Sequence, residues 1–260
     1  MDLLLDGKRV LITGGNSGLG AAIVRAFAGE HARVAINYVV NPEAAEQLAT
    51  EVRPQAADVI TVQADVANAE SVAAMFARVD AAWGGIDILI NNAGVDGPRA
   101  LAWEADPAAW MRVLQINLVG AYLCAREALK RMVAQRAGVI LCTSSVHEQI
   151  AWSGYSAYTA SKAGLAMMAK TMAQEAGPYG VRVLCLAPGA IRTPINADVW
   201  KDPAGQLDLI SKVPLARVGE TSDVAGMALV LCSNVAAYVT ATSVFVDGGM
   251  TDYPAFAHGG

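Results

Sequence analysis

The sequence is poor in the residues that build metal centres and disulfide frameworks. Only four cysteines occur in 260 residues, and they lie far apart inside apolar stretches: Cys124, Cys142, Cys185 and Cys232. The three histidines are equally scattered: His31, His147 and His258. Neither set has the close spacing of a zinc site or a redox pair. We therefore interpret the cysteines as buried apolar side chains and predict no catalytic metal.

An excess of one charge and a long apolar run are also absent. The 19 Lys and Arg against 24 Asp and Glu give a net charge of −5, without a run of like charges. The basic patch that usually marks a nucleic-acid or anionic-membrane partner is therefore missing, and small molecules or copies of the chain are the expected partners. Residues 1–9 have too short an apolar stretch for a signal peptide, and no run reaches membrane-spanning length. The expected location is the cytoplasm.

A 54% hydrophobic content supplies a large core. Short β-branched runs alternate with Ala-rich stretches of helical periodicity, which is typical of a parallel sheet covered by helices. The predicted strands are Arg9–Thr13, Arg33–Asn37, Val59–Gln63, Ile86–Ile90, Gly138–Thr143, Val181–Leu186 and Ser243–Val246. The helical segments include Ala21–Ala28, Ala69–Trp83, Ala108–Met132 and Ala157–Gln174. We predict one α/β domain over 1–260, a Rossmann-type doubly wound parallel sheet of seven strands with helices on both faces.

The segment Thr193–Arg217 differs from the rest because it holds Pro194, Pro203 and Pro214 and lacks a sustained strand pattern. It is a candidate substrate lid. An ordinary long connection has the same composition, so both interpretations stay open.

A glycine-rich turn, Thr13-Gly14-Gly15-Asn16-Ser17-Gly18-Leu19-Gly20, joins the first strand to a helix. Glycines let the backbone approach a pyrophosphate, which free amides and the positive helix end stabilise. A tight turn without a ligand is the alternative. Asp65 and Asn91-Asn92-Ala93-Gly94 also follow strands, at the sheet edge where ligands bind in such folds. Asp65 can accept a hydrogen bond from an adenine amino group, or it can cap the next helix.

Cofactor preference is expected to depend on Asn37-Tyr38-Val39-Val40, directly after the second strand. An acidic residue here favours a ribose 2′-hydroxyl, and an arginine favours a 2′-phosphate. Neither is present, and Ser17 supplies no cation. The cofactor is therefore NAD or NADP, with a preference for NAD.

The chemistry is expected at Tyr158 and Lys162, which lie four residues apart and so project from one helix face. A cation beside the phenol lowers its pKa and makes tyrosine a general acid or base. Ser145 ends a strand, where it can hydrogen-bond a substrate oxygen, and Asn117 can hold a water that relays protons from Lys162. A solvated surface Tyr–Lys pair and a capping serine are the alternatives.

In this order, the glycine turn, Asn91–Gly94 and the Asn117, Ser145, Tyr158 and Lys162 set resemble the short-chain dehydrogenase/reductase family over nearly the whole chain. Pro188-Gly189 with Thr193, and Asp247-Gly248-Gly249, belong to the same pattern. The resemblance implies an NAD(P)-dependent oxidoreductase acting on CH–OH groups. Its implied cofactor-binding residues are Gly14, Asn16, Ser17, Gly18, Leu19, Gly20, Tyr38, Asp65, Val66, Asn92, Ala93, Gly94, Tyr158, Lys162, Pro188, Gly189, Ile191 and Thr193.

Within that family, Ser145–Glu148, Gly189–Ala197 and the tail from Asp247 through Tyr253-Pro254 look like bacterial glucose 1-dehydrogenases. Those relatives are homotetramers, and the likeness implies a sugar or polyol substrate with Asp96, Ser145 and His147 beside it. His147 can instead hydrogen-bond the backbone. Val39 stands where the glucose enzymes usually have arginine, which weakens the case for NADP. A reductase of a ketone or 3-oxoacyl substrate and a non-enzymatic dinucleotide sensor are the alternative functions.

Overall fold

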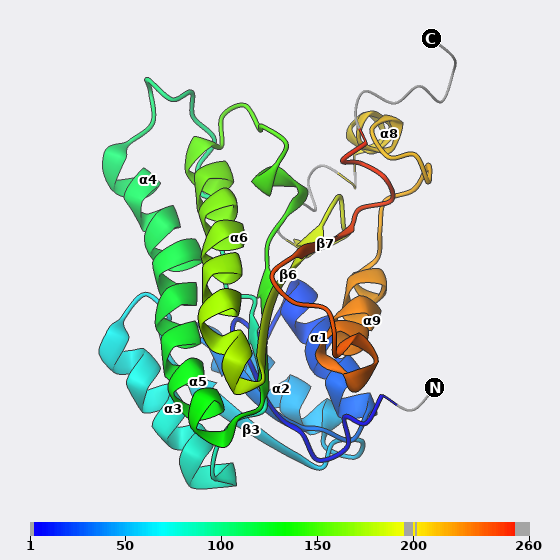
Figure 1. Ribbon diagram of the computed structural model, residues 1–260. Coiled ribbons are helices and arrows are strands. Elements are labelled where there is room, and N and C mark those ends of the chain that lie inside the picture. The colour runs from blue at the N-terminus through cyan, green and yellow to red at the C-terminus, as the bar shows by residue number, and fades with distance from the viewer. Residues whose placement is uncertain (1–2, 195–199, 201, 253–260) are drawn as a thin grey trace.

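A seven-stranded, wholly parallel sheet forms the centre of the protein, with strand order β3-β2-β1-β4-β5-β6-β7 (Figure 1). The computed structural model describes residues 3–194, 200 and 202–252. The strands are β1 (Arg9–Ile12), β2 (Arg33–Tyr38), β3 (Asp58–Gln63), β4 (Ile88–Asn91), β5 (Gly138–Thr143), β6 (Val181–Pro188) and β7 (Ser243–Val246). The predicted Rossmann-type sheet is confirmed. The fourth strand begins two residues later than predicted.

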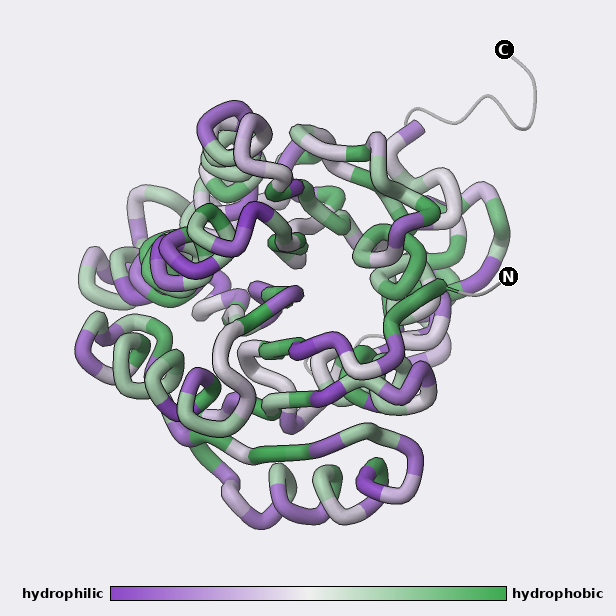
Figure 2. The backbone as a smooth tube through the Cα atoms, turned by 60° about the horizontal axis from the view of Figure 1, so that its bottom comes forward, coloured by the Kyte–Doolittle hydropathy of each residue, from purple (hydrophilic) through white to green (hydrophobic). Residues whose placement is uncertain are grey.

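Alternate residues of the strands point to two separate cores. Val10 and Ile12 belong to one hydrophobic cluster and Leu11 to the other, as the two-residue period of a strand requires. Helices α1 (Gly18–Gly29), α2 (Pro42–Val52) and α9 (Thr221–Cys232) cover the first face. Helices α3 (Ala69–Trp83), α5 (Ala121–Gln135) and α6 (Ser156–Ala176) cover the second (Figure 1). Figure 2 shows the apolar stretches along the interior strands and the polar ones mostly on the outer turns.

Asx-Pro pairs start three of the helices. Asn41, Asp106 and Asp202 each accept a hydrogen bond from the backbone amide three residues later. Proline follows each of them at the first helical position, where its missing N–H costs nothing. These pairs begin α2, α4 (Pro107–Leu114) and α8 (Pro203–Ser211). Helix α8 lies within Thr193–Arg217; of that segment, residues 195–199 and 201 lie outside the described residues.

The long helix predicted over Ala108–Met132 is interrupted by a π-helical turn. Helix α4 continues through Gln115–Gly120, which is π-helical, into α5. The sequence pattern predicted one helix because the segments on both sides of the turn, α4 and α5, are helical. By length and composition, Pro107–Gln135 passes as a candidate membrane span, with a third of its tested window buried inside the protein. Core helices meet the same criterion.

The order of the strands places a crevice between β1 and β4. The chain goes from β1 to β2 on one side, whereas β4 and β5 extend the sheet on the other side. The loops after β1 and β4 therefore diverge at the carboxyl edge, which is where open α/β sheets bind their ligands.

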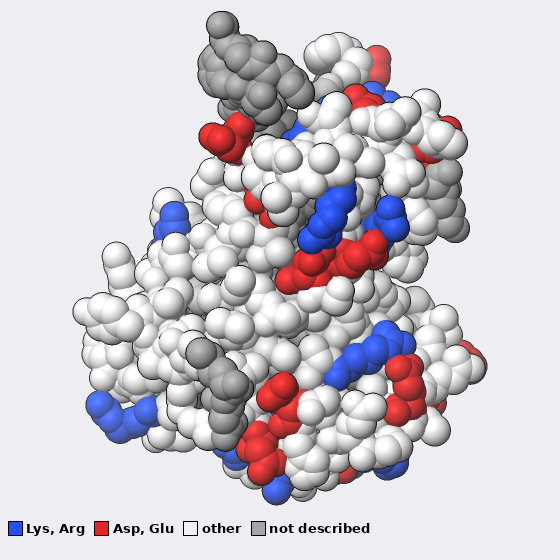
Figure 3. Space-filling model, turned by 90° about the vertical axis from the view of Figure 1, so that its right-hand side faces the viewer, with Lys and Arg blue, Asp and Glu red and all other residues white. Residues whose placement is uncertain are grey.

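Charged side chains on the surface occur mainly in mixed groups. Figure 3 shows basic and acidic residues next to one another on one face, with uncharged areas between them. Exposed ion pairs such as Arg25–Glu51 and Arg217–Asp223 have N–O distances of 2.6 and 2.7 Å. Such exposed pairs contribute little to stability.

Candidate active site

The glycine-rich turn after β1 is held in place by two buried polar side chains. Asn37 is fully buried; its Oδ1 accepts from the Gly14 amide at 3.2 Å, and its Nδ2 donates to the carbonyls of Val62 and Ala64. The Thr13 hydroxyl accepts from the backbone amides of Asn92 and Ala93 at 2.9 and 3.0 Å. The loops after β1, β2, β3 and β4 are thus joined into one rigid edge.

The first turn of α1 is open to an anion. Its N-cap residue, Ser17, makes no side-chain capping bond, and no acidic residue lies in the first turn. The backbone amides there are the ones that bind phosphate at helix N-termini. A Cβ on Gly20 would collide with the Gly14 carbonyl and approach the side-chain nitrogen of Asn92, Nδ2, to 2.7 Å. Only glycine allows this close crossing.

A cavity of about 610 Å³ runs from the glycine turn to Tyr158. Most of the predicted cofactor and substrate residues line it: Gly14, Asn16, Ser17, Gly18, Leu19, Gly20, Asp65, Val66, Asn92, Ala93, Gly94, Asp96, Ser145, His147, Tyr158, Lys162, Pro188, Gly189, Ile191 and Thr193. Tyr38 and Asn117 are predicted site residues that are not among its lining. Tyr38 packs against the hydrophobic cluster on the α1 face instead.

At one end of the cavity, Asp65 lies where an adenine ring is expected. Its Oδ1 accepts from the Ala67 amide at 2.9 Å, and its Oδ2 lies 3.4 Å from the guanidinium of Arg112. The cap of α3 is Asn68, whose side chain accepts from the Ser71 amide. The helix-capping interpretation of Asp65 is therefore wrong. Arg112 was not expected here, because a single arginine on a helix carries no sequence signal.

The residues at the end of β2 and directly after it divide between the core and the cavity. Asn37 holds the glycine turn, and Val39 and Val40 line the cavity. Asn16 reaches across to this segment, where its Nδ2 donates to the carbonyls of Val40 and Asn41 at 3.0 and 3.3 Å. Among the described residues that line the cavity, Arg112 and Lys162 are the only Lys or Arg.

At the opposite end, Ser145, Tyr158 and Lys162 lie together. The Ser145 hydroxyl lies close to the phenol of Tyr158 and acts to lower its pKa. Lys162 Nζ lies 5.5 Å from the centroid of the Tyr158 ring and donates to the Thr143 carbonyl at 2.8 Å. Lys162 is only 5% exposed, so the interpretation as a solvated surface pair is wrong. Ser145 also caps the short turn Val146–Glu148, so its capping role exists beside the contact with Tyr158.

Burial controls the protonation of both groups. It raises the pKa of Tyr158 to about 12, while the neighbouring Ser145 hydroxyl acts in the opposite direction. It lowers the pKa of Lys162 to about 8, against the opposing effect of nearby acidic groups. The expected lowering of the Tyr158 pKa is therefore not a property of the protein by itself, because loss of hydration outweighs the other effects.

Asn117 lies in the π-helical turn and is buried. Its Oδ1 accepts from the Val95 amide at 2.9 Å, and its Nδ2 donates to the Val95 carbonyl and to the Ser161 hydroxyl at 2.8 and 3.1 Å. Gly94 lies beside it, and a Cβ there would be 3.3 Å from Oδ1 and 3.7 Å from Lys162 Nζ. Both amide hydrogens of Asn117 are occupied, so a water held by this side chain must donate to Oδ1.

Aromatic rings form one wall of the reacting end. The Trp152 indole stacks on His147 at a centroid distance of 4.5 Å and on Tyr155 at 3.9 Å, and it meets the Tyr158 ring edge-on at 5.8 Å. His147 Nδ1 lies 3.0 Å from the Ile150 carbonyl, so the backbone contact considered for His147 is present. Because a carbonyl only accepts, Nδ1 carries the proton.

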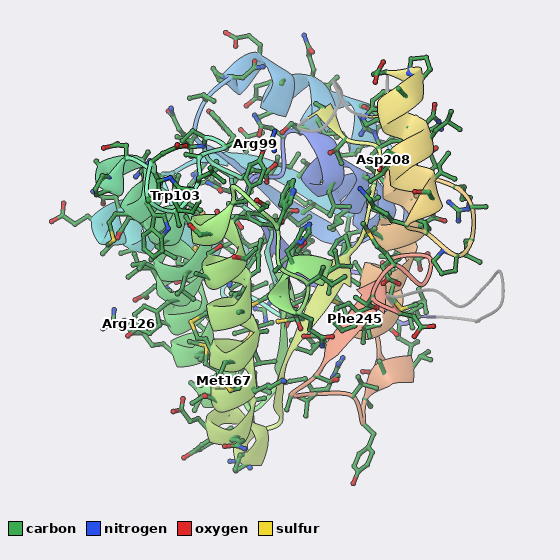
Figure 4. All side chains as sticks on the ribbon, turned by 90° about the horizontal axis from the view of Figure 1, so that it is seen from above. Arg99, Trp103, Arg126, Met167, Asp208 and Phe245 are labelled. Atoms are coloured by element: carbon green, nitrogen blue, oxygen red, sulfur yellow. The ribbon has the colours of Figure 1, made fainter. Side chains whose placement is uncertain are left out.

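Two further apolar residues line the cavity from outside the predicted motifs. Leu209 comes from α8 and Met250 from the loop after β7. Sequence reasoning missed these two and Trp152, because single apolar residues in loops or short helices are not distinguished from core residues. Figure 4 shows α8, with Asp208 labelled, at the rim of the domain, apart from α6 and Met167.

The chain matches the family model described as Enoyl-(Acyl carrier protein) reductase over residues 14–251. It is 41% identical over 259 residues to 3beta-hydroxysteroid dehydrogenase 1 of Eggerthella lenta, which covers 98% of each chain. It is 36% identical over 251 residues to Glucose 1-dehydrogenase 2 of Bacillus subtilis, covering 96% of this chain and 97% of that one.

The fold is also similar to that of solved structures. A gluconate 5-dehydrogenase from Burkholderia cenocepacia, in complex with NADP and tartrate, superposes with a TM-score of 0.91 at 33% identity. The match covers 96% of this chain and 98% of that one. The sheet order, the glycine turn and these matches agree with one another. The chain belongs to the short-chain dehydrogenase/reductase family and is an NAD(P)-dependent oxidoreductase that acts on CH–OH groups.

Proposed function

We propose that this enzyme transfers a hydride between a nicotinamide dinucleotide and the hydroxyl-bearing carbon of a sugar or polyol such as glucose. The observation that carries the proposal is the contact of Ser145 with Tyr158, beside the buried Lys162, at the opposite end of one cavity from the glycine turn. Oxidation of a hydroxyl needs a dinucleotide, which the glycine turn would bind, and an acid–base group, which Tyr158 would supply.

The residues present fit the dinucleotide. The uncapped first turn of α1 and the close crossing at Gly20 provide a cradle for a pyrophosphate. Asp65 would accept a hydrogen bond from the adenine, and Lys162 would bind the nicotinamide ribose. The cofactor accepts or donates the hydride, and its oxidised nicotinamide carries a positive charge.

In oxidation, Tyr158 takes the proton of the substrate hydroxyl while Ser145 holds the same oxygen. A positive charge near the phenol favours its ionised form and counters the effect of burial on its pKa. Lys162 adds to this effect when it is protonated, and Asn117 sustains the proton relay through its Oδ1. In reduction, Tyr158 is the acid, and its raised pKa keeps it protonated.

Two hydrogen-bond acceptors support a hydroxyl-rich substrate. Burial lowers the pKa of His147, and its proton lies on Nδ1, so Nε2 is an acceptor. Asp96 lines the same end of the cavity; burial raises the pKa of its carboxyl, which Lys162 and His147 lower. Ionised Asp96 and His147 Nε2 both need donors, which sugar hydroxyls supply and a carboxylate group does not.

The apolar wall favours the alternative, a reductase of a ketone or 3-oxoacyl substrate. Trp152, Leu209 and Met250 all line the cavity. A relative at 41% identity is named as a hydroxysteroid dehydrogenase, whose substrate class is apolar. A non-enzymatic sensor has less support, because Ser145, Tyr158 and Lys162 are all present and in contact.

For the cofactor we propose NAD over NADP. Val39 and Val40 line the cavity after β2, and neither offers a charge to a 2′-phosphate. An uncompensated phosphate against valine side chains loses hydration without gaining an ion pair.

Two further features are part of the proposal. Residues 193–217 act as a substrate lid, which is supported by Leu209 of α8 facing the cavity. The protein is a homotetramer, which is supported by the exposed apolar residues Met111, Tyr122 and Met167 on the α4, α5 and α6 helices. The cytoplasmic location stays a prediction. Light scattering of the purified protein tests the tetramer.

A substrate panel tests the function. D-glucose, D-mannitol and D-gluconate are supplied with NAD⁺ or NADP⁺, and cyclohexanone and an acetoacetyl thioester with NADH or NADPH. We expect the highest kcat/KM with a neutral polyol and NAD⁺. Faster turnover of the ketone or thioester supports the alternative, and cofactor binding without any turnover contradicts both enzymatic assignments.

A further inference from the structure

The turn that carries Ser145 is closed by a carboxylate. The Ser144 hydroxyl donates to Glu148 Oε2 at 2.6 Å, and the Glu148 amide donates to the Ser145 carbonyl at 3.0 Å. Ser144 is 3% exposed and Glu148 is half-buried, so water competes little for this bond. Hydrogen bonds to ionised carboxylates in such surroundings are among the stronger ones.

Ser144 stands between the two residues that fix the reacting groups. Its neighbour Thr143 accepts the hydrogen bond of Lys162 Nζ, and its other neighbour Ser145 contacts the Tyr158 phenol. The Ser144 amide donates to the Leu186 carbonyl of β6 at 2.8 Å. The backbone of Ser144 is therefore anchored in the sheet, and Glu148 anchors its side chain.

We propose that Glu148 is a positioning residue that holds the Ser144–Ser145 turn and thereby sets the hydroxyl of Ser145 and the ammonium of Lys162 relative to Tyr158. This inference rests on the catalytic roles proposed above for Ser145, Tyr158 and Lys162. Glu148 itself is not among the described residues that line the cavity.

The charge of Glu148 also acts on Lys162. The titratable groups around Lys162 are Cys185 of β6, Asp96 after β4, Cys142 of β5 and Glu148, while Tyr158 lies on the same helix as Lys162. Glutamine at 148 keeps an acceptor for Ser144 but removes the negative charge. Alanine removes both. The two variants therefore separate positioning from charge.

The experiment compares Glu148→Gln, Glu148→Ala and Ser144→Ala with wild type, using the panel substrate of highest turnover. Glu175→Gln, an exposed position near the end of α6, is the matched control. We measure kcat and KM between pH 6 and 10, the Kd of reduced cofactor by its fluorescence, and the Tm of each variant.

We expect Glu148→Ala to lower kcat by about 10- to 100-fold, the cost of misplacing a reacting group, while the cofactor Kd changes less than about twofold. Ser144→Ala lowers kcat in the same direction without moving the pH profile. Glu148→Gln restores most of kcat, and the limb of the profile that reports Lys162 moves to lower pH, because an anion that stabilises the ammonium is lost.

The outcomes separate this inference from the proposed function. A Tyr158→Phe variant as active as wild type, or wild type inactive on the whole panel, contradicts both. If Tyr158→Phe is inactive but folded Glu148→Ala keeps the wild-type kcat and pH profile, only the role of Glu148 is wrong. The same holds if Glu148→Gln is as impaired as Glu148→Ala.

Discussion

Lys162 Nζ donates a hydrogen bond to the backbone carbonyl of Thr143 at 2.8 Å, which ties helix α6 to the last residue of strand β5. Ser145 lies two residues further along the same chain segment. The sheet therefore sets the position of the Lys162 ammonium relative to the chain segment that leads to Ser145. An ammonium buried there has lost most of its hydration, and this loss lowers the free energy of unfolding of the protein.

We predict that Lys162→Met stabilises the protein near neutral pH. The folded-state pKa of Lys162 is about 8 against a usual value of 10.5, so the unfolded chain binds this proton more tightly. The penalty is complete below pH 8 and disappears as pH rises to 10.5, and its full size is on the order of 3 kcal/mol. The Thr143 carbonyl left without a partner offsets about 1–3 kcal/mol of the gain.

Chemical denaturation of both proteins at pH 7 and pH 10 measures this effect. The free energy of unfolding of Lys162→Met, relative to wild type, should fall by about 1–3 kcal/mol between these two pH values. Lys170→Met, an exposed position on the same helix, should show no such trend. A difference that does not change with pH would mean that Lys162 is hydrated in solution.

We predict that Tyr158→Phe lowers kcat by about 10²- to 10⁴-fold, the usual contribution of a general acid or base. The ring remains, so its edge contact with Trp152 is kept and the fold should not change. Tyr179→Phe, on the exposed side of the protein, is the control. Stopped-flow turnover and cofactor fluorescence check the result; undiminished turnover would exclude Tyr158 as the proton donor and acceptor.

The strands of this fold were predictable because parallel strands buried on both faces are continuous apolar runs. Ile88, Leu89 and Ile90 are all within 2% of complete burial. The places of the three residues proposed for catalysis were predictable because Tyr158 and Lys162 share a helix and Ser145 follows closely after a strand. Each position follows from local periodicity together with the rule that ligands bind at the carboxyl edge.

The features of the site that were not predicted depend on contacts between segments that are distant in the sequence. Asn37 was expected near the cofactor ribose, but its side chain holds the glycine turn of another loop. The π-helical turn at Asn117 was not predicted because helical segments, α4 and α5, continue on both sides of it. Trp152 becomes part of the site only because His147 and Tyr155 fold onto its two faces.

That stack leads to a prediction about substrate binding. Trp152→Ala removes two stacked ring pairs, each contributing about 0.5–1.5 kcal/mol, and frees His147 to turn. We expect KM for the substrate to rise about tenfold. The cofactor KM should stay near wild type, because the glycine turn is at the other end of the cavity.

Trp152→Phe is the conservative control, since a smaller ring still stacks on His147. Steady-state kinetics with each reactant varied in turn gives both KM values. Equal substrate KM values in Trp152→Ala and wild type would show that the aromatic wall does not position the substrate.

The last prediction concerns the cofactor phosphate. Val39 lies at the cavity where a 2′-phosphate would extend, and 44% of its surface is exposed, so a longer side chain is accommodated. An arginine at this position supplies a planar cation that binds phosphate through two hydrogen bonds. We expect Val39→Arg to lower the KM for NADP⁺ by about 10- to 100-fold, which corresponds to about 1.4–2.8 kcal/mol. The KM for NAD⁺ should change little.

Val40→Arg, at the neighbouring and more exposed position, tests whether the direction of the side chain matters. Because the new contact is an ion pair, the gain should shrink as salt is raised from 0.01 to about 0.5 M. A ratio of NADP⁺ to NAD⁺ KM that is the same in Val39→Arg and wild type would place the adenine ribose away from the end of β2.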